Sequence, residues 1–386
     1  MKNTNLIMME LMRCSATGTN PGTDLLGSVK KEMLPGMFTL AYHHDLVHLL
    51  GDVLDENGVL ENDEIATKYR SFVLEAIYRY EKIEFEFVRI CKNFEENLID
   101  FMPLKGSIIR SLYAKPWLRT SSDADILVKE ADLKRAEELL IKMGFLKTHE
   151  SSHDVTYTYG EGVIIELHFS LSEINEGEVI GQMLSDVWKY AKVKDGWKHQ
   201  YALDDNFFYF YHIAHTAKHF SMGGCGIKPI LDLYILQNTK NYDNHEIKRL
   251  LKQSGLERFD FALRSLSEVW FSGKPHDEVT LAMEEFILSG GVYGTESQLL
   301  LLKKRRAGGK IRYIFSRVFV TRRELEYEYP TLKKHSVLLP FFQVVRWVKF
   351  ILKGDKKHSK DRYEIIKNIS EENIQKIDNL FNKIGL

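Results

Sequence analysis

The chain has 386 residues, of which 44% are hydrophobic and 28% are charged. These values are ordinary for a globular protein and exclude a largely disordered chain, a collagen or a coiled-coil rod. The formal net charge of −1 conceals a basic segment, because residues 301–360 hold 17 Lys or Arg against four acidic residues. Three distant cysteines, Cys14, Cys91 and Cys225, are too few for a disulfide framework, so we expect no disulfide partner.

Residues 1–97 are predicted to form an N-terminal helical region. Leu40, His43 and Leu46 recur at spacings of three residues, and the stretch from Ala66 to Ile99 continues this helical pattern. Polar residues interrupt the apolar positions at the N-terminus, and no apolar run approaches the roughly 20 residues of a membrane span. We therefore expect a cytoplasmic protein.

The pattern changes over residues 98–172. The segment FMPL predicts a strand, which a Gly106-Ser107 turn and a short helix follow, and SDADILV predicts a second strand. A helix is expected from Glu130 to Gly144. Two further strands, Val155–Tyr159 and Val163–Phe169, are joined by glycines in a hairpin. The predicted order of elements is β-α-β-α-β-β.

Helical patterns return over residues 173–295, and we expect residues 296–386 to form a basic C-terminal helical region. The helices expected between the predicted strands and this basic region are Phe207–Phe220, Pro229–Gln237, His245–Ser254, Phe259–Trp270 and Glu278–Leu288.

Three acidic residues are candidates for a metal site. Asp123 and Asp125 are two residues apart on an expected strand, so their side chains point to one face of the sheet. Glu166 lies within the apolar segment VIIELHF, where a charge is costly unless it is paired or bound to a cation. Carboxylates suit Mg²⁺, and two such ions can activate an attacking hydroxyl and stabilise a departing pyrophosphate. The pattern therefore favours phosphoryl or nucleotidyl transfer.

The segment FMPLKGSIIRSLYAKPWLRTSSDADILV, the helix after it and VIIELHFSL resemble the uncharacterised nucleotidyltransferase family of the polymerase-β-like superfamily. The resemblance implies an α+β fold, with a nucleotidyltransferase core of a small mixed sheet and helices between N- and C-terminal helical regions. It implies metal ligation by Asp123 and Asp125 and a third acid at Glu166, which binds metal or activates the acceptor. It also implies contact between the triphosphate and Gly106 and Ser107.

This resemblance extends more weakly over residues 38–290, and the segment between the Gly-Ser turn and the Asp-x-Asp strand is longer than in compact members. Lys105 and Arg119 lie within a few residues of the expected site. Each can bind nucleotide by neutralising phosphate charge, Lys as a point charge and Arg as a bidentate fork. The alternative is that both are solvent-facing cations beside an acidic site.

A histidine-rich segment follows. His212, His215 and His219 fall on one face of an expected helix, with Lys218 beside them. We expect this face to line the cleft opposite the acids or to be half-buried packing, because a zinc site would need three ligands from one helix to converge. His168, on the strand of the third acid, either hydrogen-bonds the site or is structural.

The basic segment has several interpretations. Arg346, Lys349 and Lys353 share one face of an otherwise apolar helix, which can lie on an anionic membrane surface or dock a partner. We favour a packed helix with a narrow polar stripe. Residues 301–360 can also contact RNA through its phosphates.

The sequence as a whole predicts an enzyme, a nucleotidyltransferase that uses Mg²⁺, with two ions expected. It would transfer a nucleoside monophosphate from an NTP, with ATP as the expected donor, to a hydroxyl-type acceptor on a small molecule, a protein or RNA. One alternative is a catalytically inactive nucleotide-binding protein. The other is a membrane-surface or nucleic-acid interaction protein that acts through its basic C-terminal region.

Overall fold

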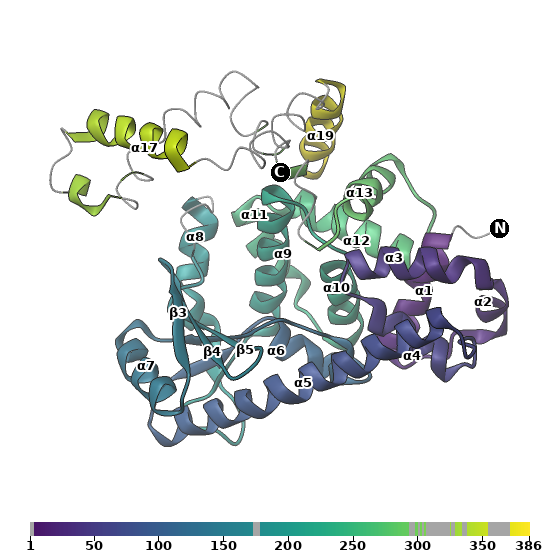
Figure 1. Ribbon diagram of the computed structural model, residues 1–386, viewed down its shortest axis with the longest axis horizontal. Helices are drawn as coiled ribbons and strands as arrows, with labels where there is room; N and C mark the ends of the chain where they lie inside the picture. The colour runs from purple at the N-terminus through teal and green to yellow at the C-terminus, as the bar shows by residue number, and fades with distance from the viewer. Residues whose placement is uncertain are drawn as a thin grey trace.

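The computed structural model describes residues 4–172, 178–292, 298–299, 302, 305, 325, 329–333, 338–353 and 371–386. Over these residues the protein has an α+β fold. N-terminal helices gather at one end of the molecule and a mixed sheet at the other, with the helices α9 and α10 between them (Figure 1).

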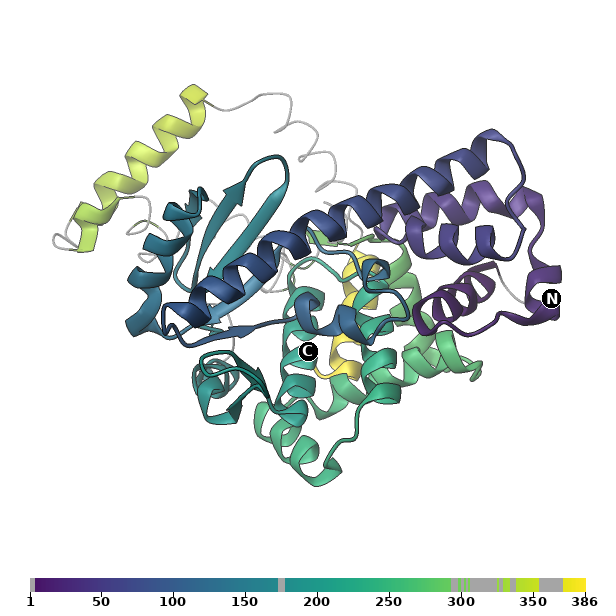
Figure 2. The same ribbon diagram turned by 90° about the horizontal axis from the view of Figure 1, so that it is seen from below.

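The N-terminal helices form as the apolar spacing predicts. The longest, α5, begins where the Asp63 carboxylate accepts a hydrogen bond from the Ala66 amide at 3.0 Å. This helix runs from the N-terminal helices to the sheet (Figure 2). Tyr69 is buried among the helices, whereas Ile83 and Phe94 are buried against the sheet. The bounds are α1 (Thr4–Thr17), α2 (Gly22–Ser28), α3 (Leu34–His43), α4 (Val47–Glu56) and α5 (Glu64–Glu96).

The sheet has five strands in the order β1-β2-β5-β4-β3. Strands β2 and β5 are parallel, and the other neighbours are antiparallel. One face of the sheet packs against α5 and α7 through a cluster that includes Ile90, Phe94 and Leu140. The bounds are β1 (Phe101–Pro103), α6 (Gly106–Ile109), β2 (Ala124–Val128), α7 (Leu133–Lys142), β3 (Leu146–Glu150), β4 (Asp154–Tyr159) and β5 (Val163–His168).

Two details of the sheet differ from the sequence-based prediction. Strand β3 was not predicted, so the order β-α-β-α-β-β lacks one strand. All five residues of β3, LKTHE, are exposed, and only the first is apolar. The segment therefore lacks the alternation of apolar and polar residues that predicts a strand. It forms by backbone pairing with β4, and its register is irregular between Lys147 and His149. Asp123 immediately precedes β2 rather than lying within it.

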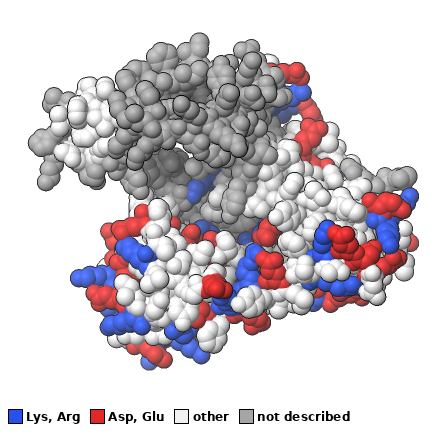
Figure 3. Space-filling view, in the orientation of Figure 1, with Lys and Arg blue, Asp and Glu red and all other residues white. Residues whose placement is uncertain are grey.

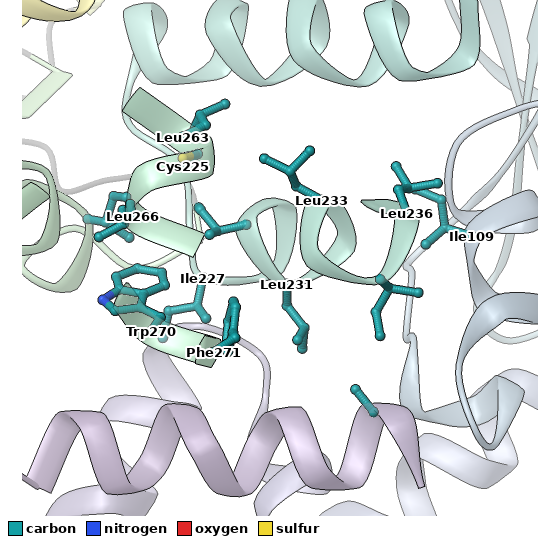
Figure 4. Packing of buried hydrophobic residues seen from close by; sticks show 14 of the residues in the cluster. Ile109, Cys225, Ile227, Leu231, Leu233, Leu236, Leu263, Leu266, Trp270 and Phe271 are labelled. Carbon is teal, nitrogen blue, oxygen red and sulfur yellow. The ribbon is translucent and has the colours of Figure 1, made fainter. Parts of the chain in front are cut away.

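The five helices predicted after the sheet are present, whereas a two-stranded antiparallel sheet, β6-β7, and helix α8 lie before them and were not predicted. Helix α9 begins at the Asp204 carboxylate, which accepts hydrogen bonds from the Asn206 and Phe207 amides at 3.0 and 3.3 Å. Helix α10 lies against α12 and α1, and Leu231 points toward α1 (Figure 4). The bounds are α8 (Glu178–Ser185), β6 (Ala191–Val193), β7 (Tyr201–Leu203), α9 (Asp205–Met222), α10 (Lys228–Thr239), α11 (Asn244–Ser254), α12 (Glu257–Ser272), α13 (Glu278–Leu288), α17 (Leu339–Lys353) and α19 (Glu371–Ile384).

All three cysteines are free and buried. On the part of the face seen in Figure 3 that the structure describes, basic and acidic side chains are intermixed. None of the helices that the structure describes is long and apolar enough to cross a membrane. Most of the basic segment 301–360 lies outside the described residues. Helix α17 is present, with Phe341 and Val344 exposed and Gln343 buried on it. The side chains of Lys349 and Lys353 lie outside the described residues, so the expectation of a packed helix with a narrow polar stripe stays a prediction.

Candidate active site

A cavity of about 570 Å³ lies between the face of the sheet that carries the acids and the helices α9 and α10. All three predicted acids line it, together with Lys105, Gly106 and Arg119. The predicted side chains of α9 line it as well: His212, His215, Lys218 and His219. The structure therefore brings together predicted residues that are far apart in the sequence.

The strand register positions the acids. Asp125 on β2 is the direct neighbour of Glu166 on the parallel strand β5. Asp123 lies two residues before Asp125 and faces the same cavity. The Asp125 carboxylate is buried, with 7% of its side chain exposed, whereas that of Glu166 is 28% exposed.

Two donors meet on one oxygen of Asp125. Lys105 Nζ lies 3.0 Å from Asp125 Oδ1, and His168 Nε2 donates to the same oxygen at 2.8 Å. Burial opposes ionisation of Asp125, but the Lys105 ammonium and His168 outweigh it and hold the pKa of Asp125 well below its usual range. Burial likewise opposes the charge on His168, but hydrogen bonds to Asp125 and Glu166 raise its pKa.

Asp123 has the opposite electrostatic environment. Burial and the nearby carboxylates of Asp125 and Glu166 raise the pKa of Asp123 to about 6. Lys105 and the Ser122 hydroxyl act against this rise. Negative charge is therefore in excess at this end of the cavity, which is the condition that a divalent cation relieves.

The described residues contain two groups of candidate metal ligands. The ligand atoms of Asp125, Glu166 and His168 lie within 4.8 Å of one another, as do those of His153, Asp154 and His168. Carboxylate oxygens fit Mg²⁺, whereas an imidazole suits softer ions such as Zn²⁺. The carboxylates of Asp125 and Glu166 in the first group fit the Mg²⁺ that the resemblance implies, whereas Asp123 lines the same cavity but belongs to neither group.

The turn before α6 has an uncommon backbone. Lys105 has φ 43° and ψ −118°, a backbone conformation that residues other than glycine rarely adopt. Holding it costs on the order of 1–3 kcal/mol. The Leu104 amide donates to the Asp125 carbonyl at 3.1 Å, which fixes this turn beside β2. A β-carbon at Gly106 would lie 3.4 Å from Arg119 Nη1, within the cavity wall.

The structure does not bring Ser107 to the cavity. Its hydroxyl is buried without a hydrogen-bond partner, and its amide donates to the Leu104 carbonyl at 3.2 Å. Ser121 and Ser122, which sequence reasoning missed, line the cavity instead. The Ser121 hydroxyl accepts from Arg110 Nη2 at 2.7 Å and donates to the Asp123 carbonyl at 2.8 Å.

Arg119 lines the cavity but is bound to a carboxylate. Its Nε and Nη2 donate to the two oxygens of Asp232 on α10 at 2.8–3.0 Å. The Tyr113 hydroxyl donates to the same carboxylate at 2.7 Å. Arg119 therefore joins the segment before β2 to α10, and its guanidinium is held in the cavity wall.

The histidines of α9 do not form a three-ligand metal site. His212 Nε2 donates to the Pro229 carbonyl at 2.9 Å, and the Nε2 atoms of His215 and His219 lie 3.1 Å apart. Burial lowers the pKa values of His212 and His215, so both are neutral near pH 7. None of the metal-ligand groups among the described residues includes them. The expectation that this face lines a cleft agrees with their position.

The far wall contains residues that sequence reasoning missed as site residues. Lys228 Nζ donates to Asp45 Oδ2 at 2.9 Å and to the Thr120 carbonyl at 3.2 Å. Arg79 Nη1 lies 3.8 Å from the other Asp45 oxygen. These residues come from α5, α10 and the segments after α3 and before β2. The segment LAYHHDLVHLL contains Asp45, but nothing in its spacing indicates its partner.

The mixed sheet presents neighbouring carboxylates to a helix-walled cavity, which is the arrangement expected of a nucleotidyltransferase. The sequence agrees: residues 35–272 match the family model described as uncharacterised nucleotidyltransferase, so the chain belongs to this family. No curated protein matches the chain.

Proposed function

We propose that the protein is a magnesium-dependent nucleotidyltransferase. It would move a nucleoside monophosphate from an NTP, with ATP as the first candidate, to a hydroxyl group of an acceptor and release pyrophosphate. The observation that carries the proposal is the pairing of Asp125 with Glu166 across parallel strands, with Asp123 beside them in one cavity.

Asp123, Asp125 and Glu166 would hold the magnesium. Bound Mg²⁺ supplies charge neutralisation for the triphosphate and lowers the pKa of an attacking hydroxyl. The acceptor oxygen would bond to the α-phosphorus as the bond to the leaving pyrophosphate breaks, and a carboxylate of Asp123 or Glu166 would take the acceptor proton. Positioning and electrostatic stabilisation would supply most of the rate increase.

Lys105 and the Gly106 surface would contact the triphosphate. Both lie at the cavity beside the acids, and Gly106 leaves the surface next to Arg119 free of a side chain. Ser121 and Ser122 offer hydroxyls at the same wall. We further propose that residues 98–172 form the catalytic core of a cytoplasmic enzyme, and that α9 and α10, within residues 173–295, face the nucleotide or the acceptor.

The first test is pyrophosphate release from ATP with Mg²⁺ present. We expect Asp123→Asn to lower turnover by at least about 100-fold, because it removes a charge that the metal site needs. Asp186→Asn is the matched control, since Asp186 forms an exposed pair with Lys189 outside the cavity. Full activity of Asp123→Asn would contradict the proposal. Intact-mass analysis of added acceptor candidates after the reaction would identify the acceptor by a nucleotide-sized gain.

One observation favours a second candidate function, a nucleotide-binding protein without transfer. Lys105 and His168 both contact Asp125 Oδ1, so two basic side chains offset the charge of this buried acid and a cation would have to compete with them. ATP binding by titration without pyrophosphate release, across the acceptors tested, would support this alternative. An interaction role for the basic region 296–386 stays a prediction, because most of that region lies outside the described residues.

A further inference from the structure

Lys105 occupies a special place at the acidic end of the cavity. Its ammonium lies 3.0 Å from Asp125 Oδ1, and 24% of its side chain is exposed. It is held there by a backbone conformation, φ 43°, that an L residue rarely adopts. A strained backbone persists only where the surrounding structure holds it in place, and such residues cluster at functional sites.

The ammonium competes with a divalent cation for the same carboxylate. Asp125 is the most deeply buried of the three acids, and its Oδ1 accepts from both Lys105 and His168. A cation that binds Asp125 must share this carboxylate with a fixed positive charge, which weakens its binding. The Lys105 ammonium and a divalent cation repel each other beside this buried carboxylate. The negative charge of a bound triphosphate would offset that repulsion.

We propose that Lys105 is the counter-ion of Asp125 when no divalent cation is bound. It neutralises Asp125 until a divalent cation binds, and its ammonium then turns to the triphosphate in the cavity. The inference rests on the proposed function. It adds that metal and nucleotide bind cooperatively: the metal releases the Lys105 ammonium to the triphosphate, and the triphosphate offsets the positive charge that opposes metal binding.

The test measures Mn²⁺ binding by the full-length, metal-stripped protein without nucleotide, from the loss of the free Mn²⁺ signal in electron paramagnetic resonance. We expect Lys105→Met to bind Mn²⁺ at least about ten-fold more tightly than the wild type, because it removes a charge-assisted contact with Asp125. Lys105→Arg keeps the charge and should bind as weakly as the wild type.

Two further variants separate charge from folding. Lys105→Gly removes the ammonium, and glycine adopts this backbone conformation without strain. The variant should therefore match Lys105→Met in Mn²⁺ affinity but have a higher melting temperature than Lys105→Met. Lys129→Met is the control for loss of a lysine, since Lys129 pairs with Asp100 away from the cavity. It should leave Mn²⁺ affinity unchanged.

A second measurement tests the coupling with nucleotide. The affinity for the α,β-methylene analogue of ATP is measured with and without Ca²⁺, which supports binding without reaction. We expect Ca²⁺ to increase the affinity of the wild type for the analogue. The increase should be smaller in Lys105→Met, because this variant has no ammonium to contact the triphosphate.

The outcomes distinguish the two proposals. If Lys105→Met and Lys105→Gly bind Mn²⁺ no more tightly than the wild type, the counter-ion role of Lys105 is overturned and the proposed function stands. If the wild type and both variants bind no Mn²⁺, both the counter-ion role and the magnesium-dependent function fail. A coupling factor that is equal in wild type and Lys105→Met overturns the transfer of the ammonium to the triphosphate.

Discussion

Asp123 and Asp125 are two residues apart, yet their carboxyl groups differ in charge state. Asp125 is held ionised by Lys105 and His168, whereas burial and its acidic neighbours raise the pKa of Asp123 to about 6. Asp125 therefore has basic side chains in direct contact, whereas Asp123 lies among other carboxyl groups. Asp123 is the residue whose protonation should respond to bound metal.

We expect Asp123→Asn to gain stability relative to the wild type as the pH rises, in the absence of metal. The pKa of Asp123 is about 6 in the folded protein against an ordinary 3.8, so folding favours the protonated carboxyl. This stabilisation is fully present below about pH 4 and is lost as the pH rises through about 6.

The measurement is urea denaturation in EDTA at about pH 4.5 and about pH 7.5. The free energy of unfolding of the variant, relative to the wild type, should rise by about 1–3 kcal/mol between these values. Added Mg²⁺ should stabilise the wild type and not the variant. A relative stability independent of pH would show that Asp123 is not crowded by its acidic neighbours.

Among single residues, the acids and Lys105 could be predicted, whereas the serines that line the cavity could not. Asp123, Asp125 and Glu166 stand out because a charge in an apolar strand needs a partner. Ser107 follows the glycine in the motif, but the backbone turns its hydroxyl into the protein. Ser121 reaches the cavity only because the intervening segment folds back beside Gly106, which local spacing does not encode.

Among the elements, the segment before β2 is fixed to α10 by one buried ion pair. Arg119 and Asp232 are 113 residues apart, and their side chains are 14% and 2% exposed. The pair holds the acid-bearing strand in place relative to the helical wall of the cavity. Sequence patterns could not predict it, because either residue alone is an ordinary charge.

We expect Asp232→Ala to destabilise the protein by about 3–5 kcal/mol, because it leaves the Arg119 guanidinium buried without its carboxylate. Equilibrium urea denaturation checks this value. Asp186→Ala, which removes an exposed partner of Lys189, should cost less than about 1 kcal/mol. If Asp232→Ala costs no more than this control, the pair does not fix α10 to the sheet.

Most helices and the four strands β1, β2, β4 and β5 were predictable because their apolar residues repeat with the period of each element, whereas α8 and the short strands β6 and β7 were not predicted. Strand β3 has no buried residue, so only its pairing with β4 identifies it. The ion pair of Asp45 with Lys228 could not be predicted either, since a separation of 183 residues leaves no local signal. The predicted domain boundaries stay predictions.

In the whole molecule, α5 links two buried clusters. Its first half packs among the N-terminal helices, and its second half covers the sheet that carries the acids. Phe94 is fully buried in the second cluster, with its ring 5.7 Å from that of Phe101 on β1. The sheet therefore depends on a helix that begins outside it.

We expect Phe94→Ala to lower the free energy of unfolding by about 3–5 kcal/mol, through lost burial and the cavity that remains. Phe85→Ala on the same helix is the matched control, since Phe85 is 70% exposed and should change stability by less than about 0.5 kcal/mol. Thermal or urea denaturation followed by circular dichroism measures both. Equal effects would show that α5 does not support the sheet.

The exposed outer strand has a consequence for the behaviour of the protein at high concentration. Strand β3 ends the sheet, so the backbone amides and carbonyls on its outer side have no neighbouring strand among the described residues. Such an edge can recruit a strand from another molecule and start aggregation. Here Lys147, in ion pairs with Glu137 and Glu150, and the irregular register beside it oppose such recruitment.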